Sequence, residues 1–191
     1  MPHPSFDPSS DSLAYHAARI LVLIRRCGSP QQSTTKMPGV KGRTLLAKLD
    51  FFLRYPMYLI KAARIAEAEE TSSKRVLAQA ASMAEPAKTV ESPMVRYKYG
   101  PWDHTYYLVL AYLIGKGLIR VDMEGRTEVF RVTDRGRGVA DALSETPAYA
   151  ELVGRASLVH GLFGGFSGNR LKTYIYERFP EVVARKHDEL I

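Results

Sequence analysis

Residues 94–143 decide the fold, and they read MVRYKYGPWDHTYYLVLAYLIGKGLIRVDMEGRTEVFRVTDRGRGVADAL. Basic and apolar side chains alternate over residues 96–99, as in a short strand, and a glycine-proline pair then turns the chain. Asp103 is a good N-cap for a helix over residues 104–115, because its carboxylate can accept a hydrogen bond from a free backbone N–H group of the first turn.

Two strands and another helix are predicted next. Gly117 lies where a helix commonly ends, and strands are expected over residues 118–122 and 127–132 around a tight Glu-Gly turn. Thr133 caps a helix that continues to about Leu143. Helix, strand, turn, strand and helix in this order are typical of a winged helix-turn-helix. The sequence therefore predicts a mainly α-helical fold with a small β-wing, flanked by N- and C-terminal helices.

The rest of the chain divides around this motif. A helix capped by Asp11 or Ser12 is expected to end near Arg26, before a polar stretch rich in proline and glycine. Apolar periodicity predicts further helices over residues 45–55, 57–70, 71–84, 147–162, 169–178 and 181–191. The expected regions are a flexible N-terminus (1–10), an N-terminal helix and linker (11–42), the winged-helix domain (43–143) and a C-terminal helical segment (144–191).

The composition is that of an ordinary globular protein. Hydrophobic residues make up 46% and charged residues 25% of the 191 residues. The N-terminus lacks a basic stretch followed by an apolar one, and the apolar run near it is shorter than the roughly 20 residues that a bilayer span requires. A single cysteine, Cys27, excludes an internal disulfide and fits a reducing compartment. We therefore expect a cytoplasmic protein with no membrane contact.

The histidines and glycines form no pattern of a catalytic centre. None of the five histidines lies at metal-ligand spacing from another histidine or from the cysteine. The glycine run at residues 164–168 follows a predicted helix and lacks the Lys-Ser/Thr of a phosphate loop, so a turn between helices is the better interpretation. We expect no catalytic residues, no metal and no cofactor.

The helix over residues 104–115 occupies the position that reads DNA bases in many winged helices. It contains no Arg, Lys, Asn or Gln, the side chains that make bidentate base contacts. It is instead apolar or aromatic nearly all round, which is typical of a helix buried on most sides. A protein partner, or the flanking helices of this chain, should cover its second face.

The predicted wing is rich in arginine, and the formal net charge of +7 permits a polyanionic partner. Contact with DNA phosphates, without reading of sequence, is one interpretation. The other is a solvated hairpin whose arginines pair with nearby Asp and Glu residues. The candidate phosphate contacts are Lys116, Arg120, Arg126, Arg131 and Arg135, with Arg137 in the same cluster.

Aromatic residues concentrate just before and within the same helix. Tyrosine, tryptophan and arginine are enriched where protein partners bind most tightly, although they are also common in cores. Of these residues, Trp102 is expected to anchor the core, and Tyr97 and Tyr99 are the better interface candidates. The candidate partner interface is Tyr97, Tyr99, Trp102, His104, Tyr107 and Leu113.

The segments RYKYGPWDHTYY (96–107) and LAYLIGKGLI (110–119), with LLAKLDFFLRYP (45–56) before them and LKTYIYERFPEV (171–182) after them, resemble a known family. The chain is similar over residues 45–182 to the middle component of bacterial ABC-three component systems, which are conflict or antiphage modules. YGPWD is the most specific part of this resemblance.

The resemblance implies a non-catalytic winged-helix adaptor that links an SMC-like ABC ATPase to an effector protein, near DNA held by the ATPase. It supplies no catalytic residues. The alternative is a dimeric winged-helix transcription regulator, in which the first helix, around residues 14–24, pairs with its counterpart in a second subunit.

Overall fold

The computed structural model describes residues 12–28, 38–83 and 93–191; the expected flexible N-terminus and most of the linker lie outside them. The fold is mainly helical with a small antiparallel sheet, as predicted. None of the described helices is long and apolar enough to cross a membrane. The elements in chain order are α1 (Leu13–Cys27), β1 (Val40–Lys41), α2 (Arg43–Arg54), α3 (Pro56–Ala68), α4 (Lys74–Ser82), β2 (Val95–Tyr97), β3 (Gly100–Trp102), α5 (Tyr106–Gly115), β4 (Ile119–Glu124), β5 (Thr127–Val132), α6 (Asp134–Glu145), the 3₁₀ turn η2 (Pro147–Tyr149), α7 (Ala150–Phe163), α8 (Gly168–Arg178) and α9 (Pro180–Val183).

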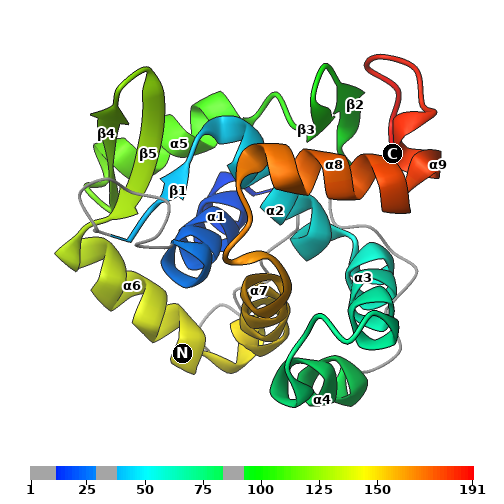
Figure 1. Ribbon diagram of the computed structural model, residues 1–191. Coiled ribbons are helices and arrows are strands. Elements are labelled where there is room, and N and C mark those ends of the chain that lie inside the picture. The colour runs from blue at the N-terminus through cyan, green and yellow to red at the C-terminus, as the bar shows by residue number, and fades with distance from the viewer. Residues whose placement is uncertain (1–11, 29–37, 84–92) are drawn as a thin grey trace.

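Helix α1 lies in the middle of the molecule (Figure 1). Its predicted cap is confirmed, since the Ser12 hydroxyl accepts a hydrogen bond from the backbone N–H of Tyr15 at 3.1 Å. The helix packs against α5, α6, α7 and β5, and every residue from His16 to Ile24 is buried. Residues 14–24 are thus largely covered by this chain's own elements. This corrects the prediction that the first helix pairs with a second subunit.

A network of buried charges joins α1, α2 and α5. The Asp50 carboxylate accepts hydrogen bonds from Arg19 Nε at 2.9 Å, Arg54 Nε at 2.8 Å and the Tyr106 hydroxyl at 2.7 Å. Burial alone raises the pKa of Asp50, but the two guanidiniums and the tyrosine hydrogen bond outweigh it and hold the pKa below its ordinary value. Arg54 also donates to Asp103 at 2.6 Å, immediately before α5.

Asp103, the expected N-cap, therefore makes both a local and a tertiary interaction. One carboxylate oxygen accepts from the Thr105 backbone N–H at 2.8 Å, and the other accepts from Arg54 of α2. Helix α5 itself begins at Tyr106, two residues later than predicted. The start of α5 is thus held by a tertiary ion pair as well as by a local turn.

The predicted hairpin is confirmed, with small shifts at its ends. Strands β4 and β5 pair from Ile119↔Val132 to Glu124↔Thr127, and Gly125 adopts a positive φ of 61° in the turn. Strand β1 adds to the other edge of β5 through Val40↔Phe130. Sequence patterning assigned β1 to the linker, because a strand of two residues is too short to show alternation.

A second hairpin, β2–β3, precedes α5. Its turn falls on Lys98 and Tyr99, whereas the predicted turn residues at 100–101 belong to β3. The C-terminal tail runs along β2, where the Arg96 N–H donates to the Glu189 carbonyl at 2.8 Å. The helix predicted over residues 181–191 accordingly ends at Val183, since the backbone beyond it bonds to β2.

The first turn of α6 is fitted tightly against the end of α5. The Thr133 hydroxyl caps α6 by accepting from the Gly136 N–H at 3.0 Å, and it donates to the Gly117 carbonyl at 2.7 Å. A Cβ at Gly136 would lie 1.9 Å from the Leu118 carbonyl oxygen. A side chain at this position would therefore push α6 away from the hairpin.

Loss of the Asp50 charge should destabilise the fold, because two guanidiniums would remain buried without their shared carboxylate. We expect Asp50→Asn to lower the free energy of unfolding in urea by about 3–5 kcal/mol at neutral pH. Because the folded pKa is depressed, this contribution is complete above the unfolded pKa of about 3.9 and is lost as pH falls through the folded value. Asp141→Asn, which breaks an exposed pair with Arg25, should cost less than about 1 kcal/mol. Equal effects of the two variants would contradict the account.

Gly136 and Gly138 offer a matched pair in one helix. Gly136→Ala should lower the melting temperature strongly, because its Cβ would overlap the Leu118 carbonyl. Nothing lies within 4 Å of a Cβ at Gly138, so Gly138→Ala should stabilise the protein by about 0.5–1 kcal/mol. Thermal unfolding followed by circular dichroism checks both, and destabilisation by Gly138→Ala would contradict the packing described for α6.

Candidate functional site

An aromatic pocket opens where the β2–β3 hairpin meets the first turns of α2 and α5. Its volume is about 240 Å³. The pocket brings together four of the six predicted interface residues, namely Tyr97, Tyr99, Trp102 and Tyr107. The full lining is Arg43, Thr44, Lys48, Tyr97, Tyr99, Pro101, Trp102 and Tyr107.

Some aromatic rings of the pocket pack into the core, and others are exposed to solvent. The indole of Trp102 is 9% exposed and meets Tyr106 edge to face at 5.2 Å between centroids, so it anchors the core as expected. Tyr97 stacks on Trp102 at 6.1 Å. Tyr99 and Tyr107 are 57% and 59% exposed. Exposed aromatic side chains of this kind bury large area at low entropic cost when a partner docks.

Cations surround these rings. The Arg43 guanidinium lies 5.2 Å from the centroid of Tyr107 and pairs with Glu128 at 2.7 Å. The Lys172 ammonium, from α8, lies 5.8 Å from the centroid of Tyr99. The pocket is therefore aromatic in its walls and positive at its rim.

Lys48 belongs to this pocket, although the sequence analysis did not single it out. The residue is 3% exposed, and Nζ donates to the Thr44 carbonyl at 2.9 Å. Burial, reinforced by the positive charge of Lys172, lowers the pKa of Lys48 to about 8. A signal was present in the sequence, since Lys48 falls on the apolar stripe formed by Leu45 and Phe52 at helical spacing.

The two other predicted interface residues lie elsewhere. His104 is exposed at the edge of the hairpin, 5.7 Å from the Tyr97 ring and 3.7 Å from the Asp188 carboxylate, and does not line the pocket. Leu113 is 0% exposed and packs within the chain's own core. It presents no surface to a partner, which corrects its assignment as an interface residue.

Within this chain, helix α5 is buried on one face only. The alternative in which the chain's own flanking helices cover its second face is therefore wrong, whereas cover by a protein partner stays a prediction. Tyr106, Val109 and Leu113 face the core, where α1 covers them. Leu108 and Ile114 are exposed, next to the exposed Tyr107. The face of α5 turned away from the core is therefore apolar, and no described element of this chain covers it.

Most wing arginines are occupied by acidic neighbours. Arg131 is buried and bonds to Asp122 at 2.6 Å and to Glu124, so it is not available to a DNA phosphate, which corrects that assignment. Arg120 pairs with Asp122 at 3.4 Å, and Arg137 pairs with Asp134. The observed pairing favours the interpretation in which these arginines pair with nearby Asp and Glu residues, with Arg120 and Arg137 exposed to solvent and Arg131 buried.

Lys116, Arg126 and Arg135 differ from them. All three are exposed, and among the described residues none of them forms an ion pair. Lys116 lies 5.6 Å from the ring of Tyr112. They remain the candidates for contact with phosphate groups.

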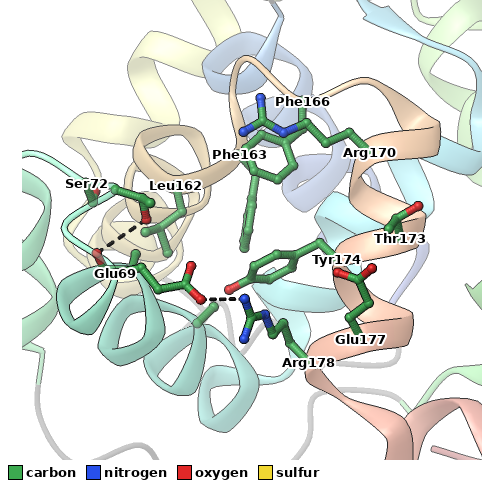
Figure 2. Close-up of a pocket in the computed structure, with 13 residues that line it drawn as sticks. Glu69, Ser72, Leu162, Phe163, Phe166, Arg170, Thr173, Tyr174, Glu177 and Arg178 are labelled. Atoms are coloured by element: carbon green, nitrogen blue, oxygen red, sulfur yellow. Dashed lines mark hydrogen bonds and ion pairs between the residues drawn. The ribbon is translucent and has the colours of Figure 1, made fainter.

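A larger pocket, of about 450 Å³, lies between α3, α7 and α8 (Figure 2). Phe163, Phe166 and Tyr174 form its apolar side. Arg178 of this pocket pairs with Glu69, and the Arg170 guanidinium lies 3.9 Å from the centroid of Phe166. None of the predicted interface residues lines this pocket.

Over residues 12–28, 38–83 and 93–191, no group of histidine, cysteine, aspartate and glutamate side chains is arranged to hold a metal ion. Cys27 is buried, and burial raises the pKa of its thiol to about 12, so it is held as a neutral thiol. No protein-family model, curated protein or solved structure matches this chain.

Proposed function

We propose that the chain is a winged-helix protein whose α5, β4–β5 hairpin and α6 correspond to the recognition-position helix, the wing and the helix after it. The order of these elements supports this classification. The cap at Thr133 and the close packing of Gly136 against the Leu118 carbonyl also support it. The additional helices α7 and α8 and the hairpin β2–β3 extend the motif on both sides.

We further propose that the protein is a non-catalytic adaptor subunit of a bacterial defence system, in which it links an SMC-like ABC ATPase to an effector protein. The observation that carries this proposal is the uncovered surface formed by the aromatic pocket and the outer face of α5. Where a DNA-reading helix carries hydrogen-bonding side chains, α5 presents Tyr107, Leu108 and Ile114 to solvent. Exposed apolar and aromatic surface of this kind marks protein interaction sites.

Co-expression of the chain with the products of its neighbouring genes tests this function. We expect an ABC ATPase with a coiled coil to be encoded nearby and to co-purify with the chain. Tyr107→Ser should weaken that complex at least tenfold, because Tyr107 is exposed at the junction of the pocket and α5.

Met57→Ser is the matched control, since Met57 is also exposed but lies at the start of α3, outside the pocket and α5. It should leave the complex intact, and thermal unfolding should show both variants folded. Absence of such a gene and of any co-purifying neighbour would contradict the adaptor function.

A DNA-binding role is the second candidate, and the exposure of Lys116, Arg126 and Arg135 favours it. We expect weak binding to duplex DNA without sequence preference, because these side chains are placed to reach phosphates only. The double variant Arg126→Gln/Arg135→Gln should reduce the slope of log K against log salt by about 2 in gel-shift titrations. Salt-resistant, sequence-specific binding to the upstream region of its own gene would instead support a transcription regulator.

A further inference from the structure

The charges of the aromatic pocket are not balanced within it. Arg43 and Lys48 line the pocket, and no carboxylate does. Arg43 is compensated by Glu128, but Lys48 forms no ion pair with any residue that the structure describes. Its hydrogen bond in the structure goes to a backbone carbonyl. A buried ammonium with an open, apolar pocket beside it is therefore the unusual feature of this surface.

Burying a lysine without a carboxylate is costly, because the ammonium loses water and gains no opposite charge. Lysines are therefore among the residues least often fully buried unless they are paired. The aliphatic stem explains the position on the apolar stripe of α2, but a leucine or methionine would fill that space without the cost. A carboxylate delivered from outside would supply the missing partner.

We propose that the aromatic pocket receives an acidic segment of a protein partner, with an apolar side chain between Tyr99 and Tyr107 and a neighbouring carboxylate on the Lys48 ammonium. This inference rests on the proposed adaptor function and names the chemistry of the partner. Charge complementarity supports it, because Arg43, Lys48 and Lys172 gather around one small pocket whose walls are aromatic.

The placement of the rings favours a peptide over single-stranded nucleic acid. Proteins that bind single strands present open ring faces for bases along a positive groove. Here a cation already lies against each exposed tyrosine, Arg43 against Tyr107 and Lys172 against Tyr99, and Tyr97 stacks on Trp102. The pocket that these tyrosines line has a volume of about 240 Å³, which is enough for one apolar side chain of a partner.

The proposal has a pH signature. The groups facing Lys48 are Arg43 and Thr44 from its own helix, Lys172 from α8, and tyrosines 97, 99 and 107 from the hairpin and α5. The pKa of the unoccupied Lys48 is about 8, and a bound carboxylate raises it, so binding takes up a proton near and above that pH. Affinity should therefore fall about tenfold between pH 7 and pH 9.

Nuclear magnetic resonance titration of the full chain tests the proposal. The probe is the acetylated, amidated peptide Asp-Glu-Phe-Glu-Asp, and the matched control replaces its acids with asparagine and glutamine. We expect the acidic peptide alone to shift the Lys48 side-chain and Tyr99 signals, with weaker binding at pH 9. Lys48→Met keeps the stem and removes the charge, so it should stay folded, bind at least tenfold more weakly and lose the pH dependence.

The outcomes distinguish failure of the acidic-segment proposal from failure of the proposed adaptor function. Equal binding of both peptides, no binding of either, or unchanged binding by Lys48→Met would overturn the acidic-segment proposal, even if a partner still co-purifies and still depends on Tyr107. Shifts at the pocket caused by a thymidylate hexamer and not by the peptide would overturn it in favour of nucleic acid.

Discussion

The carboxylate of Asp50 holds α1, α2 and α5 in one arrangement. It accepts hydrogen bonds from Arg19, Arg54 and Tyr106, each from a different part of the chain. The side chains of Asp50, Arg19 and Arg54 are almost completely buried. Removal of one of them leaves a charge without its partner in the protein interior, where an unpaired charge strongly destabilises the fold. Such a network specifies which surfaces of the helices meet, whereas apolar packing alone tolerates sliding.

The geometry of the aromatic pocket depends on this arrangement. Arg54 reaches from α2 to Asp103, which fixes the point where the chain leaves β3 and enters α5. Trp102 and Tyr107 flank that point, and Lys48 lies on the same helix as Arg54. The aromatic pocket thus lies next to the buried charge network, and Tyr99 and Tyr107 are exposed beside it. A preorganised surface loses less entropy on binding than a flexible one.

Local signals in the sequence were enough for the elements of the motif. The hairpin, its turn at Gly125 and the cap at Thr133 follow from alternation and turn chemistry, which act over a few residues. The clustering of Tyr97, Tyr99, Trp102 and Tyr107 was also predictable, because they are neighbours in sequence. The burial of Arg131 was not predictable, since it depends on pairing across β4–β5. The apolar stripe of α2 indicates that Lys48 is buried, but its place beside the aromatic pocket and Lys172 depends on α8 approaching α2 from far along the chain.

If the chain docks a protein through the aromatic pocket and α5, this surface should be protected from solvent in the complex. Hydrogen–deuterium exchange of the chain, alone and in complex with the protein that co-purifies with it, measures that protection. We predict slower exchange over residues 97–108, covering the β2–β3 turn and the start of α5, with little change over the β4–β5 hairpin. Protection confined to residues 123–137, at the hairpin tip and the start of α6, would contradict it.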